Sequence, residues 1–143
     1  GRYYLICNTD GHENIVHYRI DKMTDVKMLK IPAKNKKDIA EFIGGNFNLP
    51  KHMAEHIYMF SGESVWVKFW AEKNFLDAVV DWFGKDFKIL QKTDDKILIN
   101  VKVNETAMKF WAMQYGDGIE IISPENLRFS IQQSAKNIFE KYC

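Results

Sequence analysis

The sequence predicts a protein of the α+β class, with a β-hairpin at its start and a sheet covered by helices in its second half. Residues 3–8 and 15–30 have the apolar-polar alternation of strands, and a turn-rich segment separates them. From residue 63 onward, strand and helix patterns follow in the order strand-helix-strand-strand-helix-strand-helix. A chain of 143 residues that is 46% hydrophobic can bury a folded core.

The second arm of the predicted hairpin carries most of its polar groups. Residues 8–14 form the turn, because they are rich in Asn, Asp and Gly, which tolerate turn geometry. Successive side chains of a strand point to opposite faces, so His17, Arg19 and Asp21 should share one face. The opposite face then holds Val16, Tyr18 and Ile20.

The segment after the hairpin is predicted to be a connector. Residues 31–37 are rich in lysine and form a basic linker. Residues 38–60 contain short helical turns that are interrupted at Gly44-Gly45 and at Pro50. An irregular connector with short helices is therefore expected.

The second half is predicted to be ferredoxin-like, because its strand-helix-strand-strand-helix-strand order is that of the split βαβ arrangement. Gly84 and Gly116 follow the first two helices as stops, and Asn104 is the expected N-cap of the second. Ser123-Pro124-Glu125 predicts a final helix with Ser123 as N-cap and Pro124 at the first position. The expected elements are strands at 65–69, 87–92, 96–103 and 119–122 and helices at 74–83, 105–115 and 124–142.

Two groups of aromatic residues in this half have different expected roles. The residues on the predicted helices should pack on one face of the sheet: Phe75, Val79, Trp82, Phe83, Phe110, Trp111 and Tyr115. Trp66 and Trp70 alternate away from the core side of their strand, so they should lie on the opposite face with Lys68. They are predicted to form a self-association or interdomain contact. The alternative is that the terminal helix or the connector covers them.

Charge is distributed unevenly along the chain. Residues 1–37 hold 8 Lys and Arg against 4 Asp and Glu, whereas residues 38–143 hold 12 against 15. A local cationic field favours an anionic partner at the hairpin. A solvated basic face is the alternative.

The strongest candidate site lies on the hairpin. Arg19 can clamp a phosphate through two parallel hydrogen bonds, a protonated His17 can donate to the same anion, and a tyrosine can stack on a base. The predicted ligand-binding residues are Arg2, Tyr4, His17, Tyr18, Arg19, Asp21 and Lys22. The alternative is that Arg19 and Asp21 form an internal pair while both tyrosines pack inside the fold.

Several classes of function are not expected. No nucleophile-base set or phosphate-binding glycine loop is present, so the chain is not predicted to be an enzyme and no cofactor is predicted. His52 and His56 match the H-x-x-E-H pattern of some zinc proteases, but Pro50 starts only a short helical segment, so no metal site is predicted. The second half lacks the paired aromatic residues of an RNA-recognition domain. Cys7 and Cys143 form no disulfide framework, which favours a reducing cytoplasmic location, and no apolar run is long enough for a membrane span.

Tyr3-Tyr4-Leu5 resembles the Trp-Tyr-Leu run that names the WYL domain, the ligand-sensing module of bacterial transcriptional regulators. That family follows the run with a strand of the form aromatic-Arg-aliphatic-Asp-Arg-aliphatic, which here is residues 18–23. Tyr3 replaces the Trp, and Lys22 replaces the second Arg, which keeps the charge but loses the bidentate fork. Residues 59–63, 81–84 and 114–116 resemble landmarks of the WCX domain, which is the C-terminal extension of these regulators.

This resemblance implies a domain plan. Residues 1–32 would be the C-terminal half of a WYL β-barrel of the SH3/Sm-like type, residues 33–62 the connector, and residues 63–143 the WCX domain. Because the chain starts directly in a strand, upstream barrel strands and a helix-turn-helix domain are expected beyond it, or a second copy supplies the missing strands.

The resemblance also implies partners. An anionic effector, a single-stranded nucleic acid or a nucleotide, would bind the basic patch of a homodimer, and duplex operator DNA would bind only through the helix-turn-helix domain. Two alternatives stay open, a pure dimerisation module and a sensor of a small carboxylate metabolite. The sequence names neither the effector nor the operator.

Overall fold

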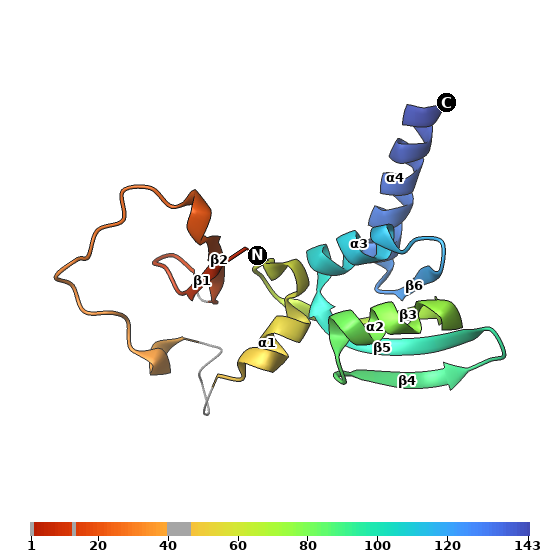
Figure 1. Cartoon of the computed structure of the whole chain (residues 1–143), viewed down its shortest axis with the longest axis horizontal. Coiled ribbons are helices and arrows are strands. Elements are labelled where there is room, and N and C mark those ends of the chain that lie inside the picture. The colour runs from red at the N-terminus through yellow and green to blue at the C-terminus, as the bar shows by residue number, and fades with distance from the viewer. Residues whose placement is uncertain (1, 13, 40–46) are drawn as a thin grey trace.

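The computed structural model of the chain describes residues 2–12, 14–39 and 47–143. Within them lie a two-stranded sheet, a four-stranded sheet and four α-helices, which confirms the predicted α+β class. Figure 1 shows the hairpin at one end of the molecule and the larger sheet with its helices at the other, with helix α1 between them.

The hairpin consists of β1 (Tyr4–Cys7) and β2 (Val16–Arg19), paired antiparallel with Tyr4 opposite Arg19. The second arm is much shorter than the predicted range of 15–30. After Arg19 the chain turns into a 3₁₀ helix, η1 (Ile20–Lys22), so Asp21 does not continue the strand. The last cross-strand bond runs from the Ile20 N–H to the Tyr3 carbonyl oxygen at 3.0 Å, and the chain then closes its own turn through the Met23 N–H and the Ile20 carbonyl oxygen at 3.1 Å.

Residues 23–39 contain one regular element, the 3₁₀ turn η2 (Lys36–Asp38). Val26, Met28, Leu29 and Ile31 are exposed, with Met28 at 99%, whereas Ile39 is buried. The helix α1 (Leu49–Glu55) begins at the N-cap Asn48, whose side chain accepts a hydrogen bond from the backbone N–H of Lys51. The 3₁₀ turn η4 (Ile57–Met59) follows, and the predicted break at Gly44-Gly45 lies outside the described residues.

The four-stranded sheet has the order β4-β5-β3-β6, and all neighbouring strands are antiparallel. Its strands are β3 (Ser64–Glu72), β4 (Phe87–Lys92), β5 (Lys96–Asn104) and β6 (Ile119–Ser123). A short turn η5 (Lys73–Phe75) and helix α2 (Leu76–Phe83) link β3 to β4, and helix α3 (Glu105–Gln114) links β5 to β6. The predicted order of strands and helices is therefore present.

Helices α2 and α3 pack on one face of this sheet. Phe69 of β3, Phe83 of α2 and Trp111 of α3 are fully buried, and the rings of Phe83 and Trp111 meet edge to face at 4.9 Å. The predicted core residues Val79, Phe83 and Trp111 are confirmed as buried, and Phe75, Trp82 and Tyr115 pack against the core at its edge. Phe110 is a wrong core prediction because it is 55% exposed. The buried stripe of α3 consists of Ala107, Met108, Trp111 and Ala112, and Phe110 lies outside it on the helical wheel, so its ring does not face the sheet.

The final helix, α4 (Glu125–Tyr142), packs only through its first turns. Its N-cap is Pro124 and not Ser123, so the proline precedes the helix instead of occupying its first position. Leu127 is buried, but Ile138 and Tyr142 on the same predicted apolar face are exposed. The rest of α4 extends away from the sheet (Figure 1).

The described residues contain no helix with the length and apolar character needed to cross a membrane.

Candidate ligand-binding site

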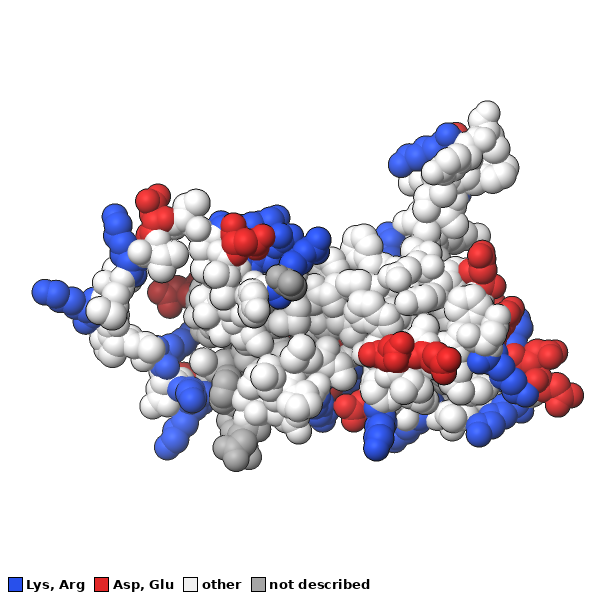
Figure 2. Space-filling view, viewed as in Figure 1, with Lys and Arg blue, Asp and Glu red and all other residues white. Residues whose placement is uncertain are grey.

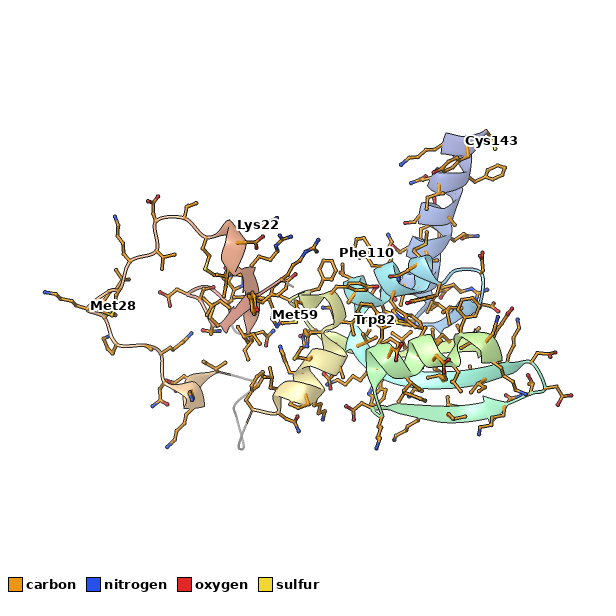
Figure 3. The ribbon with its side chains drawn as sticks, in the orientation of Figure 1. Lys22, Met28, Met59, Trp82, Phe110 and Cys143 are labelled. Carbon is orange, nitrogen blue, oxygen red and sulfur yellow. The ribbon has the colours of Figure 1, made fainter. Side chains whose placement is uncertain are left out.

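A groove of about 750 Å³ lies between the hairpin and the second half of the chain. It has two unlike walls, one from the hairpin and one from η4, α3 and α4. The lining residues are Arg2, Tyr4, Arg19, Lys22, Tyr58, Met59, Phe60, Phe110, Met113, Gln114 and Ile138. Figure 3 shows Lys22 on the hairpin side and Met59 and Phe110 on the facing side.

The hairpin wall carries the positive charge. The strand register places Tyr4 directly opposite Arg19, and both side chains therefore point to one face of the two-stranded sheet. Arg2 precedes β1 and Lys22 ends η1, so both lie at the same end of the hairpin and reach the groove. Figure 2 shows Lys and Arg side chains gathered around the hairpin and the segment that follows it.

Arg19 is held by Asp21. Its Nε donates to Oδ1 of Asp21 at 3.0 Å, and its Nη2 donates to Oδ2 at 2.5 Å. This bidentate bond lowers the pKa of Asp21 and raises that of Arg19. The internal pair that the sequence left open is thus present, but it uses only part of a guanidinium that has five N–H donors. The pair orients Arg19 at the groove, and its net charge is neutral, which leaves Arg2 and Lys22 as the excess positive charge.

The facing wall is aromatic and apolar. The rings of Phe60 and Phe110 stack with centroids 5.4 Å apart and an interplanar angle of 6°. The hydroxyl of Tyr58 donates to Oε1 of Gln114 at 2.7 Å, and partial burial raises the pKa of Tyr58. This wall therefore presents flat rings and one fixed amide toward the cationic hairpin.

The backbone of this wall is strained. Tyr58 has φ 60° and Met59 has φ 57°, in the left-handed region that large side chains rarely adopt. Such residues cost on the order of 1–3 kcal/mol each and concentrate at binding sites. Two of them in succession turn the chain sharply between α1 and β3, which carries the side chains of Tyr58 and Met59 to the groove.

His17 contacts the connector rather than the groove. Its backbone N–H donates to Oγ of Ser61 at 3.0 Å, and its Nε2 lies 2.9 Å from Nε2 of His52. One imidazole must donate and the other accept, so this bond needs a single proton between the two nitrogens. His17 thus joins the hairpin to α1, and Tyr18 points to the opposite face, where it is 44% exposed.

His52 and His56 stack on one face of α1, with ring centroids 4.1 Å apart. His52 is 8% exposed, and burial, with additional repulsion from His56 and His17, lowers its pKa from 6.5 to about 4. Both ring nitrogens of His56 face carbonyl oxygens, those of His52 and Gly62. Among the described residues, no group of three or more His, Cys, Asp or Glu side chains could hold a metal ion.

Trp66 and Trp70 both lie on the sheet face opposite α2 and α3. Trp66 is 53% exposed, and Lys51 and Glu55 of α1 lie at the edge of the hollow that it lines. Trp70 is half-buried between its neighbours on β5 and β6. The connector therefore flanks Trp66 without covering it.

The structure brings together four of the predicted ligand-binding residues: Arg2, Tyr4, Arg19 and Lys22. Sequence reasoning missed the aromatic wall, of which Phe60 and Phe110 are the main parts. The aromatic character of Phe110 favoured a core position, and the only sequence signal against it is that it lies outside the helical stripe of Ala107, Met108, Trp111 and Ala112. The turn at Tyr58 and Met59 has none either, since neither residue type favours a positive φ.

By fold and site, the chain is an α+β protein with a groove between a cationic hairpin and an aromatic wall. Residues 63–139 match the family model of the WCX domain, which covers more than half of the chain, so the chain belongs to the WCX-domain family. The WCX domain extends WYL-domain regulatory proteins at their C-terminal side and is not a known enzyme family, which supports a regulatory role. A search of curated proteins finds no match.

Proposed function

We propose that this chain is the effector-sensing and dimerisation region of a WYL-type bacterial transcriptional regulator, and that its groove binds a single-stranded nucleic acid or a nucleotide. The observation that carries the proposal is the pairing of a cationic wall with a stacked aromatic wall across one groove. The cationic wall can bind the phosphates of such a ligand, and the aromatic wall can stack on its bases. Residues 1–32 would be the C-terminal half of the WYL barrel in this plan.

The phosphate side of the proposal rests on Arg2, Arg19 and Lys22. Asp21 fixes the plane of the Arg19 guanidinium and leaves N–H donors for a phosphate oxygen. Arg2 and Lys22 supply the uncompensated charge. Binding through such contacts releases counterions, so affinity falls steeply with salt.

The base side rests on Phe60 and Phe110. Their rings are parallel, and Phe110 is 55% exposed on a rigid helix. Stacking of one base on an aromatic ring contributes about 1–3 kcal/mol. Gln114, held by Tyr58, offers an amide that can bond to the edge of a base.

Regulation follows from the position of the groove. A ligand that touches both walls favours the arrangement in which hairpin and WCX domain lie at this distance, provided it binds that arrangement better than others. The exposed apolar residues of α4, including Ile138 at the rim of the groove, support self-association of the second half. Operator DNA would be bound by a helix-turn-helix domain outside this chain.

The test is fluorescence anisotropy of a short labelled single-stranded oligonucleotide, titrated with the chain at two salt concentrations. Arg19→Ala and Lys22→Ala should each weaken binding about 10-fold and reduce the salt slope by about 1. Lys136→Ala, on the exposed part of α4, is the matched control and should leave both quantities unchanged. Unaltered binding in the groove variants, with their thermal unfolding intact, would refute the proposal.

A small carboxylate metabolite is the second candidate, because Arg19 and Lys22 suit a carboxylate as well as a phosphate. It predicts binding without a steep salt slope and without loss in Phe110→Ala. The same titration, with a labelled dicarboxylate as competitor, separates the two.

A further inference from the structure

We propose that the sheet face around Trp66 is a second binding surface for single-stranded nucleic acid, separate from the groove. Trp66 lies on β3 between residues whose side chains point the other way, and Val67 is fully buried against the helices. Its indole is 53% exposed on a strand whose pairing with β5 is unbroken from Ser64 to Glu72. A flat aromatic ring is therefore displayed on a rigid support.

The surroundings of Trp66 are cationic. A hollow of about 290 Å³ is lined by Lys51, Glu55, Trp66, Lys85, Asp86, Phe87, Lys88 and Lys102. The four lysines come from three segments, namely α1, the start of β4 with the turn before it, and β5, and Glu55 is already paired with Lys102 at 3.4 Å. Positive charge thus exceeds negative charge around the ring, which complements a phosphate backbone.

The lysines continue across the sheet. Strand register places Lys68 of β3 and Lys88 of β4 on either side of Asn100 of β5. Oδ1 of Asn100 is buried and has no hydrogen-bond partner within the described part of the chain. This row offers positive charges at its two ends, and on β3 Lys68 lies two residues from Trp66 on the same face of the sheet.

The surroundings of Trp70 show that the excess of positive charge is confined to the Trp66 end of the sheet face. Its hollow, about 70 Å³, contains Glu72, Asp117 and Glu120 against a single lysine, Lys96. The two tryptophans share a strand and a face but have opposite electrostatic surroundings. An anionic chain fits the Trp66 end and is repelled at the Trp70 end.

A single strand suits this surface better than a duplex. Single strands expose the faces of their bases, and an aromatic ring flanked by lysines binds a base and its phosphates together. The arrangement differs from an RNA-recognition domain, because the residue opposite Trp66 on β5 is Lys102 and not a second aromatic residue. One stacked base with a row of lysines predicts weak, salt-dependent binding with little sequence preference.

The test uses the full chain with Arg19→Ala and Lys22→Ala as the background, so that the contribution of the groove is reduced and is the same in every variant compared. A short fluorescein-labelled oligothymidylate is titrated and followed by anisotropy. Adding Trp66→Ala should weaken binding about 5- to 100-fold, the range for one stacked base, while Trp66→Phe should retain most of it. Trp70→Ala is the matched control and should change binding less than about 2-fold.

Lys85→Gln and Lys88→Gln together keep the ring and should reduce the salt slope by about 2. This double variant tests the surface even if Trp66→Ala fails to fold. Equal effects of Trp66→Ala and Trp70→Ala, or an unchanged salt slope, would overturn the proposal. Competition by polyglutamate as strong as that by unlabelled oligothymidylate would also overturn it and indicate an acidic protein partner. If the chain with Arg19→Ala and Lys22→Ala has already lost binding, and adding a Trp66 substitution changes nothing further, the groove is the single binding site and the proposal is refuted.

Discussion

Different kinds of interaction stabilise the hairpin and the WCX domain. The WCX domain encloses a continuous core in which Phe69, Phe83 and Trp111 are fully buried. Among the described residues of the hairpin one apolar residue, Ile15, is buried, and polar contacts from His17 to His52 and Ser61 join the hairpin to the rest of the chain. Burial of apolar area dominates stability. The WCX domain is therefore expected to contribute most of the stability, and the hairpin is the less firmly anchored region.

The largest test of this comparison is Phe83→Ala. It should lower the free energy of unfolding by about 3–5 kcal/mol, because it leaves a cavity beside Phe69 and Trp111. Leu5→Ala in the hairpin is the control and should cost less than about 1 kcal/mol, since Leu5 is exposed. Urea unfolding followed by circular dichroism measures both. Similar losses would show that the hairpin shares the core's stability.

A smaller effect is expected at Asn104, which joins the connector to the sheet. Its side chain accepts from the N–H of Ala107 at 3.0 Å as the N-cap of α3 and donates to the carbonyl of Ser61 at 3.2 Å. Asn104→Ala should cost about 1–2 kcal/mol. Asn104→Asp keeps the cap and loses the donor, so a melting temperature between those of the wild type and Asn104→Ala is expected. Identical melting temperatures for Asn104→Ala and Asn104→Asp would show that the N-cap hydrogen bond does not contribute to stability.

The histidine contact should make the hairpin pH-sensitive. The pKa of His52 is about 4 in the folded chain and 6.5 when free, so the unfolded state binds the proton first. Stability that is complete above pH 6.5 is therefore lost as the pH falls toward 4, by on the order of 1–2 kcal/mol. Hydrogen exchange of β1 and β2 amides between pH 7 and pH 4.5, corrected for intrinsic rates, should show the loss.

His52→Gln should flatten this pH dependence, and His12→Gln, in the exposed turn, should not. An equally steep dependence in His52→Gln would assign the effect to other groups.

The effect on stability should be small at Met59, which lies at the boundary between the hairpin side and the WCX domain. Met59→Gly removes a side chain from a backbone with φ 57°, so unfolding free energy should stay within about 1 kcal/mol of wild type or rise. Met113→Gly on α3 should instead lower it by about 1 kcal/mol. Differential scanning fluorimetry distinguishes the two. A clear loss in Met59→Gly would mean that packing of this side chain outweighs the strain.

Much of the WCX domain could be predicted from sequence because its signals are local. Alternation placed Val67 and Phe69 on the core side of β3, and Asn104 was recognised as an N-cap. The hairpin was predicted less well, since the length of β2 depends on where its partner strand begins. The sequence predicts Ser123 as the N-cap of α4, whereas the structure has Pro124 there, because Ser-Pro-Glu is compatible with both positions.

The α+β class, the core face of β3 and the cationic character of the hairpin could be predicted from the amino-acid sequence. These features follow from hydrophobic periodicity and local charge, which can be read from residues that are neighbours in the sequence. Three features became visible only in the folded chain: Phe60 and Phe110 line the same groove as Arg19 and Lys22, His17 contacts His52, and Trp66 and Trp70 have different surroundings. Each of these depends on segments far apart in the chain. No local pattern encodes which of them become neighbours, because packing of the whole fold sets those distances.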